Sequence, residues 1–422
     1  MKFKKTTLSN GLRIITIPMR DTRAVTIMVL VEAGSKYETK EINGLSHFLE
    51  HMCFKGTVKR PSAFAISSEL DGIGAQSNAF TDKEYTGYYA KADKKYFTKI
   101  TDIVSDIYLN STFPKIDLEK EKGVVIEEIN MYEDLPQRKV WENFEELLYG
   151  DQPAGWPVIG NKENIKKISQ QDLVKYRKNH YVAKSTIIVV AGNVEEKEAV
   201  REVKTAFSKV PNGPKKSKKK TIDKQDKPKT AIQFKATDQT HLVLGFRSFD
   251  VHDERHWALG VMSTILGKGM SSRLFIKMRE ELGICYYIHT SSGVASDTGY
   301  FAVSAGVGNQ RTEEAIEAIM NELKKIKSEG VGEKEIRKAK DFMIGNLSLD
   351  LEGSDDYANY YGFQEVLRES VLVPAGHIKK IEAVTREQIK AVAEDIFKEK
   401  GLNLSLIGPF KDDKKFLSHL SI

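Results

Sequence analysis

The feature that most constrains the fold is an internal repeat. Residues 168–193 (ISQQDLVKYRKNHYVAKSTIIVVAGN) align without gaps with residues 384–409 (VTREQIKAVAEDIFKEKGLNLSLIGP), at a shift of 216 residues (384 − 168). In each copy, a pattern with the 3.6-residue period of a helix leads into an apolar segment typical of a strand. Ser169 and Thr385 open these helices and are expected to be their N-caps. One repeat over about half of the 422 residues predicts two similar domains rather than a solenoid.

The rest of each half follows the same order of elements. Strand-like segments come before helical ones, and further strands and long helices follow; the segments are 22–35, 43–52 and 81–90 in the first half and 239–248, 255–267 and 298–305 in the second. Because strands and helices come in runs, we predict an α+β fold with two homologous domains, each a mixed, mainly antiparallel β-sheet flanked by α-helices. The predicted boundaries are 1–210, a linker at 211–229, and 230–422.

The formal net charge of +6 is concentrated in the predicted linker. Residues 215–229 (KKSKKKTIDKQDKPK) hold eight lysines and two aspartates, which alone give +6 (8 − 2). A lysine tract can bind phosphate groups. Since no aromatic residues or recognition motif accompany this one, a solvated linker is favoured and no nucleic-acid partner is expected.

Cysteine content and hydropathy bound the compartment. Two cysteines, Cys53 and Cys285, cannot form a disulfide framework, and both are expected to be small buried residues. The start, MKFKKTTLSNGLRIITI, lacks the apolar run of a secretory signal. The longest apolar run, residues 24–34, falls short of the roughly 20 residues of a membrane span. We therefore expect a cytoplasmic protein without a membrane partner.

Residues 44–56, GLSHFLEHMCFKG, carry the clearest chemistry. On a helix, His47 and His51 are four residues apart and share a face, so both imidazoles can bind one metal ion. Glu50 lies beside them and can take a proton from a metal-bound water. The separate apolar stripe of this helix explains its packing without the histidines; its members are Leu45, Phe48, Leu49 and Met52. Asn43 is expected to cap the helix and Gly56 to follow its end.

A catalytic zinc needs a third protein ligand. The segment 118–136, LEKEKGVVIEEINMYEDLP, reads as a helix, and one of its sides carries Glu121, Val124, Val125, Glu128 and Tyr132. An acid within a largely apolar face must be paired or bound to metal, which makes Glu128 the candidate ligand. Glu121, two turns earlier, is a candidate supporting acid, whereas Glu127 is expected to face solvent.

These residues together resemble the pitrilysin/insulinase family of zinc peptidases, which carry the inverted His-x-x-Glu-His motif. The half-length bacterial type related to the mitochondrial processing peptidase is the most similar. The resemblance covers almost the whole chain, including VEAGS (31–35) and NAFTDKEYTGYY (78–89). It implies one Zn²⁺ per chain bound by His47, His51 and Glu128, with Glu50 as general base and Glu121 supporting the site. It also implies that Asn78, Ala79 and Phe80 form an edge strand on which an extended substrate adds its backbone.

The second half lacks the zinc motif. Its segment 269–287, GMSSRLFIKMREELGICYY, resembles the family segment in which an Arg and a Tyr seven residues later reach the zinc site. The resemblance assigns these roles to Arg279 and Tyr286, with Arg273 and Tyr287 as alternatives. A guanidinium and a phenol can stabilise the oxyanion of a tetrahedral intermediate. The stretch GKGMSS (267–272) is interpreted as a glycine-rich turn, because Gly269 stands where a phosphate loop needs Ser or Thr.

The sequence therefore predicts a zinc metalloendopeptidase acting on short or unfolded peptides. Longer relatives enclose substrate between more domains, so the resemblance implies a dimer with a clamshell chamber. A homodimer suffices, because one chain carries both the zinc motif and the Arg–Tyr pair; one subunit would then supply zinc and the other Arg279 and Tyr286. A heterodimer with a related subunit is the alternative. The alternative within the family is a catalytically silent scaffold or processing-partner subunit. A nucleic-acid binder acting through the lysine tract is a second alternative.

Overall fold

The computed structural model describes residues 3–422. These residues form two compact units, each built from three segments. The first comprises the chain up to Asn130, Trp156–Lys219 and Ser348–Pro374, and the second comprises Met131–Gly155, Lys220–Leu347 and Ala375–Ile422. Since each unit takes one segment from the other half of the chain, the compact units are not the contiguous stretches 1–210 and 230–422 into which the repeat divides the sequence.

A six-stranded sheet in the order β1-β2-β6-β3-β5-β4 forms the centre of the first unit. Its strands are β1 (Lys4–Thr7), β2 (Arg13–Pro18), β3 (Ala24–Val31), β4 (Gln76–Thr81), β5 (Thr86–Asp93) and β6 (Thr186–Gly192). β2 and β6 are parallel, and the other neighbours are antiparallel. The strand β4, which the resemblance identifies as a substrate strand, lies at one edge.

The sheet of the second unit repeats this topology with five strands, in the order β7-β11-β8-β10-β9. The strands are β7 (Lys229–Phe234), β8 (Gln239–Ser248), β9 (Cys285–Val294), β10 (Gly299–Gly308) and β11 (Asn403–Gly408). Again one pair, β7 and β11, is parallel and the rest are antiparallel. The predicted α+β fold with two mixed, mainly antiparallel sheets is thereby confirmed.

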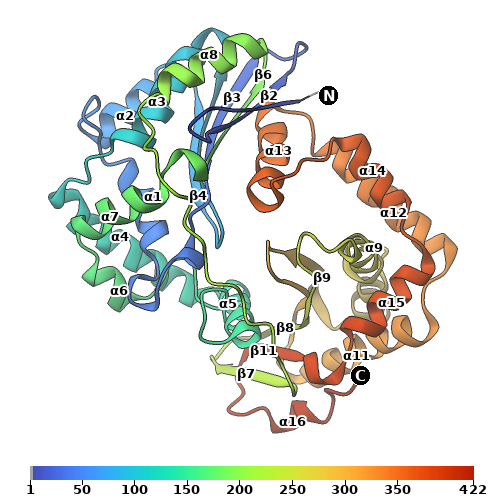
Figure 1. Ribbon diagram of the computed structural model, residues 1–422. Helices are drawn as coiled ribbons and strands as arrows, with labels where there is room; N and C mark the ends of the chain where they lie inside the picture. Colours follow the sequence, from blue (N-terminus) through green and yellow to red (C-terminus); the bar gives the residue numbers. More distant parts are fainter. Residues whose placement is uncertain (1–2) are drawn as a thin grey trace. The chain divides into compact units, whose positions relative to one another are not determined.

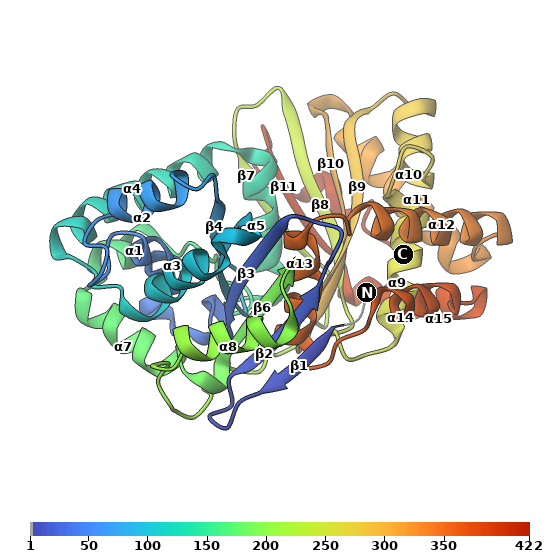
Figure 2. The ribbon, with the colours of Figure 1, turned by 90° about the horizontal axis from the view of Figure 1, so that it is seen from above.

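Helices cover both faces of each sheet (Figures 1 and 2). In the first unit, α3 (Phe97–Asn110) and α8 (Glu196–Ala206) pack on one face and α13 (Ser354–Arg368) on the other. In the second unit, α5 (Pro136–Tyr149) covers one face, and α9 (Arg255–Gly267), α11 (Thr312–Glu329) and α15 (Arg386–Ile396) belong to the other. The remaining longer helices are α1 (Leu45–Cys53), α2 (Ala63–Asp71), α4 (Lys115–Asp134), α7 (Gln170–His180), α12 (Glu333–Leu349) and α14 (Pro374–Glu382).

The helices α13 and α5 contribute to the cores of the first and second units, and each comes from the half of the sequence that forms the other sheet. Tyr357, Ala358 and Tyr361 of α13 pack on buried side chains of the first sheet, among them Met28 and Val189. In the second unit, Val140, Phe144 and Leu148 of α5 pack on Val243, Ala302 and Ile407. Each sheet therefore completes its core with a helix from the opposite half of the sequence.

The repeat seen in the sequence has the predicted local structure. Ser169 accepts a hydrogen bond from the backbone of Asp172, and Thr385 accepts one from Gln388, so both are N-caps within capping boxes. Each of these helices, α7 and α15, leads into a fully buried strand, β6 or β11. Cys53 and Cys285 are both free and buried, as expected.

The lysine-rich tract makes ion pairs with the first unit. Residues 210–228 form neither helix nor strand. The ammonium of Lys215 bridges the buried Glu32 and, at 2.6 Å, the exposed Glu369, and Lys218 lies 3.5 Å from the buried Glu84. Part of the linker is therefore fixed by carboxylates rather than fully solvated. Within residues 3–422, no helix combines the length and apolar character needed to cross a membrane.

Candidate metal centre

The helix α1, which carries both histidines, begins in a cap that local sequence does not reveal. The backbone N–H groups at the start of this helix bond to Glu38, whose carboxyl group accepts from Gly44 (2.8 Å) and Ser46 (2.6 Å). Asn43, the predicted cap, instead donates to Glu38 and to the carbonyl of Pro157. The prediction for Asn43 was therefore wrong, because the carboxyl group of Glu38, several residues upstream, replaces the short polar side chain as the acceptor.

The apolar stripe of α1 packs as predicted. Leu45, Phe48, Leu49 and Met52 are fully or almost fully buried. His47, Glu50 and His51 are partly buried and lie outside that stripe. The helix ends at Cys53, and Gly56 follows with a positive φ of 140°. Packing thus fixes the helix while its polar face remains accessible.

The second contributing helix, α4, forms over the predicted segment but presents a narrower buried face. Glu121 and Val125 are buried, Glu128 is partly buried and Glu127 is exposed. Val124 is 52% exposed, so its assignment to the same side was wrong. The buried line runs through Leu118, Glu121, Val125 and Ile129, at spacings of three and four residues. Val124 is rotated by about 100° from Val125, which takes it off this line.

Three side chains from these helices converge. One ligand atom from each of His47, His51 and Glu128 lies within 4.8 Å of the others. The Glu128 Oε2 atom is 3.8 Å from Nε2 of His47 and 3.7 Å from Nε2 of His51. Tetrahedral zinc with bonds near 2.0–2.1 Å places its ligand atoms about 3.3 Å apart. The set therefore fits a zinc ion with only small adjustments, and three protein ligands leave a fourth position for water or substrate.

Glu121 fixes the orientation of His51. Its Oε1 is 2.9 Å from Nδ1 of His51, so the ring presents Nε2 to Glu128. Burial opposes protonation of His51, but the hydrogen bond to Glu121 and the nearby carboxylates outweigh it and raise the His51 pKa. The pKa of Glu121 is lowered, because hydrogen bonds from His51 and Lys55 outweigh its burial. A carboxylate behind the imidazole is the usual support of a metal-binding histidine.

Glu50 has a different environment from Glu121. Its Oε2 accepts a 2.6 Å hydrogen bond from the hydroxyl of Thr81 at the end of β4. Burial raises the pKa of Glu50, and the negative charge of Glu128 adds to the shift, while Thr81 and His51 oppose it. A raised pKa brings a carboxylate closer to the range of an efficient proton acceptor. Thr81 was not singled out in the sequence, where only its place directly after NAF (78–80) pointed to it.

The predicted substrate residues Asn78, Ala79 and Phe80 lie on β4, which pairs only with β5 in the described sheet. Asn78 is exposed and the other two are partly exposed. The backbone N–H of Asp82 bonds the Tyr85 carbonyl, and antiparallel pairs alternate, so the outward backbone groups belong to Ser77, Ala79 and Thr81. The Ala79 N–H bonds the side-chain oxygen of Asn78 at 2.9 Å, and a strand added at this edge would replace that local contact.

Arg279 and Tyr286 belong to the second unit and lie together. Arg279 sits in a π-helical turn, Ile276–Glu281, and its guanidinium donates to the backbone carbonyl of Tyr286. The pairing of β9 with β10 shifts by one residue between Gly306 and Val307 of β10. These two residues pair with Tyr287 and Cys285, so Tyr286 is the extra residue of a β-bulge in β9. Its side chain is 73% exposed. Both side chains thus come from backbone irregularities that frequently occur at functional sites.

The two alternatives are engaged elsewhere. Arg273 forms an ion pair with Glu335, at 2.7 Å, and donates to the carbonyl of Gly330. The hydroxyl of Tyr287 is 3.0 Å from Nδ1 of His241. Arg279 and Tyr286 are therefore the more exposed pair in this segment.

Comparisons with known proteins agree with these features. Residues 13–162 match the family model "Insulinase (Peptidase family M16)", and residues 167–343 match "Peptidase M16 inactive domain". An uncharacterized zinc protease of Bacillus subtilis is 35% identical over 407 residues, covering 96% of this chain and 98% of the relative. One of Streptomyces coelicolor is 33% identical, covering 99% and 92%. The crystal structure of a protease from Helicobacter pylori has the same fold, with a TM-score of 0.91 at 23% identity over 97% of this chain and 99% of that chain.

Proposed function

Because the chain belongs to the insulinase family of peptidases (peptidase family M16), we propose that it is a zinc-dependent metalloendopeptidase that cleaves short or unfolded peptides. The observation that carries the proposal is the convergence of ligand atoms of His47, His51 and Glu128 within 4.8 Å. Glu50 lies on α1, the helix that carries both histidines. Relatives named as zinc proteases over nearly the full length support it.

In this proposal His47, His51 and Glu128 hold one Zn²⁺ per chain. When bound, zinc polarises the scissile carbonyl and lowers the pKa of a bound water to about 7. Glu121 keeps His51 in the orientation that directs Nε2 to the metal. Glu50 accepts the proton of the attacking water and later delivers it to the leaving amine. Thr81 holds the Glu50 carboxylate through its hydroxyl.

We assign substrate binding to β4. An extended peptide adds to its free edge through the outward backbone groups of Ala79 and its neighbours, which gives affinity with little sequence dependence. Most strands of a folded protein already pair within its own sheets, whereas an unfolded peptide has its whole backbone free to pair. This is why short or unfolded peptides are the proposed substrates.

Arg279 and Tyr286 are assigned to stabilising the tetrahedral intermediate, in a homodimer whose sites combine both subunits. Mixing a Glu50→Gln chain with an Arg279→Ala chain tests the arrangement. Each is expected to be inactive alone, and mixed dimers should regain one working site. No recovered activity despite verified subunit exchange would contradict shared sites.

A catalytically silent scaffold is the alternative, and one observation favours it: part of the chain matches a model described as an inactive domain. That match begins at residue 167, however, beyond His47, His51 and Glu128. A library of quenched peptides, with and without chelator, separates the two functions. We expect cleavage that chelation removes and zinc restores, and that Glu50→Gln reduces by about 10²–10⁴-fold with zinc still bound. Stoichiometric zinc without cleavage of any peptide would favour the scaffold.

A further inference from the structure

Lys55 lies directly behind the acid that supports His51. Its ammonium is 2.6 Å from Oε2 of Glu121, while Oε1 of the same carboxylate contacts Nδ1 of His51 at 2.9 Å. The side chain of Glu121 is only 6% exposed and that of Lys55 is 27% exposed. Lys55, Glu121 and His51 thus form a continuous chain of charge-assisted hydrogen bonds that ends at a candidate zinc ligand.

The backbone next to Lys55 is braced. The carbonyl of Gly56 accepts a hydrogen bond from the N–H of Thr112, and the N–H of Thr57 donates to the carbonyl of Arg60, three residues later. Gly56 has φ of 140°, and an added Cβ would lie 2.9 Å from the Pro61 carbonyl. The ammonium of Lys55 is therefore presented from a fixed turn rather than from a mobile loop.

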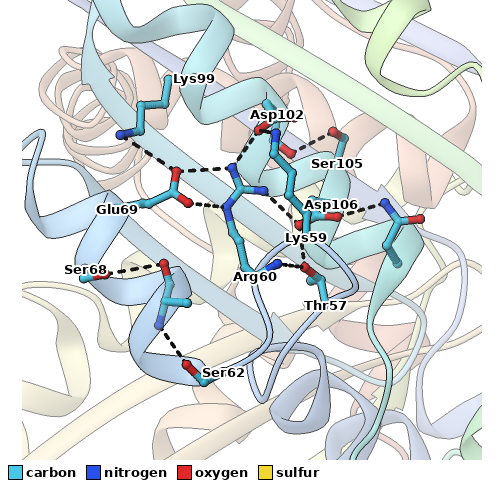
Figure 3. A network of polar contacts seen from close by, with 12 residues as sticks. Thr57, Lys59, Arg60, Ser62, Ser68, Glu69, Lys99, Asp102, Ser105 and Asp106 are labelled. Atoms are coloured by element: carbon cyan, nitrogen blue, oxygen red, sulfur yellow. Dashed lines mark hydrogen bonds and ion pairs between the residues drawn. The ribbon is translucent and has the colours of Figure 1, made fainter.

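Arg60 anchors this turn to two helices (Figure 3). It is 2% exposed, and its guanidinium donates to Glu69 of α2 and to Asp102 and Asp106 of α3, at 2.6–3.3 Å. Asp106 also accepts from the hydroxyl of Thr57 at 2.6 Å. A buried guanidinium with three carboxylates holds a loop in place at the cost of desolvation, which suits a segment whose position matters.

From this geometry we propose that Lys55 is a positioning residue that strengthens zinc binding at His51 by holding the Glu121 carboxylate in place. The inference rests on the proposed function. Without the ammonium, Oε2 of a buried carboxylate loses its charged donor, and Glu121 can rotate away from His51 or lose its charge. The imidazole then loses the partner that fixes its orientation and raises its basicity as a ligand.

Direct charge repulsion predicts the opposite change in zinc affinity when Lys55 is replaced. A lysine near a divalent cation repels it, so removing Lys55 on that ground alone would tighten zinc binding. Positioning through Glu121 predicts weaker binding instead. The direction of the change separates the two effects.

The experiment is a zinc titration of the full-length protein in competition with a chromophoric chelator. Lys55→Met removes the charge at similar length, and Lys55→Arg restores a charged donor. Lys122→Met is the matched control, since Lys122 is a lysine of α4 that pairs with Glu119, at 2.9 Å, rather than with Glu121. The same Lys55→Met change is also made in a Glu121→Gln background, and unfolding of each zinc-free variant checks the fold.

We expect Lys55→Met to weaken zinc binding about tenfold, and Lys55→Arg and Lys122→Met to stay within about twofold of the wild type. In the Glu121→Gln background the Lys55→Met change should have little further effect, because its route of action is already lost. Unchanged or tighter binding in Lys55→Met, or an equal loss in the Glu121→Gln background, overturns the proposal. A wild-type protein that binds no zinc overturns both this inference and the proposed function.

Discussion

Three carboxylates surround the histidine pair, and their environments separate their roles. Glu121 uses both oxygens, one toward His51 and one toward Lys55, and its pKa is lowered. Glu50 bonds Thr81, and burial raises its pKa. Glu128 places one oxygen between both imidazoles. Neighbouring acids whose pKa values are pushed apart by their surroundings are suited to different tasks, which supports the proposed assignment of proton transfer to Glu50 and of support for His51 to Glu121.

The residue that caps α1 gives a pH-dependent prediction. Burial raises the pKa of Glu38 to about 7, against hydrogen bonds from Ser46, Gly44 and Asn43 that lower it. The folded carboxyl therefore keeps its proton to higher pH than the unfolded one. At Glu38 the folded state then binds more protons than the unfolded state between about pH 4.5 and pH 7. The contribution of Glu38 to the free energy of unfolding therefore falls as pH rises through this window.

The comparison that isolates this effect is wild type against Glu38→Gln, which cannot titrate. Measured by urea unfolding at several pH values, the free energy of unfolding of the wild type should decrease relative to the variant, by up to about 3 kcal/mol, from pH 4.5 to above pH 7. A difference that stays constant over this range would show that Glu38 titrates normally in the folded state.

At the scale of elements, the entry of α1 depends on Gly44. Its φ is +100°, and a Cβ there would lie 2.7 Å from the carbonyl oxygen of Ile159 and 2.9 Å from Cα of Gly160. Gly44→Ala is expected to destabilise the protein by about 1–3 kcal/mol. Gly123→Ala in α4 is the control, since a Cβ there meets nothing within 4 Å and should stabilise by about 1 kcal/mol. Equal thermal stabilities of the two variants would contradict this account.

The strand β4 gives a second prediction at this scale. Ala79→Pro removes an outward N–H without breaking the bonds to β5. If substrate adds to this edge, KM should rise about tenfold with a smaller change in kcat. Asn78→Ala removes the side-chain oxygen that accepts from the Ala79 N–H at 2.9 Å and leaves that donor for substrate, so it should not raise KM. Steady-state kinetics on one quenched peptide measures both KM and kcat. An unchanged KM in a folded Ala79→Pro variant would remove β4 from the substrate site.

Local patterns predicted elements well where the cause is local. The apolar stripe of α1 and the caps Ser169 and Thr385 depend on residues within one or two helical turns, and all are confirmed. The cap by Glu38 and the exposure of Val124 depend on how neighbouring segments pack, which a single-sequence period does not contain. The site followed the same division: the spacing of His47 and His51 is local, whereas Thr81 and Lys55 reach the site only through the fold.

For the whole molecule, the exchange of α5 and α13 is the feature that the repeat conceals. Both helices are amphipathic, and nothing in their sequences states which sheet they cover. The apolar face of the first sheet, including Met28, Leu30 and Val189, is fully buried in a cluster with Tyr361 of α13. A domain boundary placed in the linker separates the first sheet from α13, the helix that covers its apolar face.

A chain ending at residue 210 tests this dependence. It lacks α13 and exposes apolar side chains that are fully buried in the complete protein. We expect it to aggregate or to unfold without cooperativity, with strong binding of a hydrophobic dye. Supplying residues 348–374 on a flexible linker, with residues 131–155 of the second unit replaced by a short polar linker, should restore a cooperative transition. A stable, cooperatively unfolding chain of residues 1–210 would show that the helix exchange is dispensable.

The most direct measurement is a crystal structure of the zinc-loaded protein with anomalous difference maps recorded above and below the zinc absorption edge. The account predicts one peak per chain, about 2.0–2.1 Å from Nε2 of His47, Nε2 of His51 and a carboxylate oxygen of Glu128. A peak elsewhere, or none at these three side chains in protein shown to be fully loaded, would contradict it.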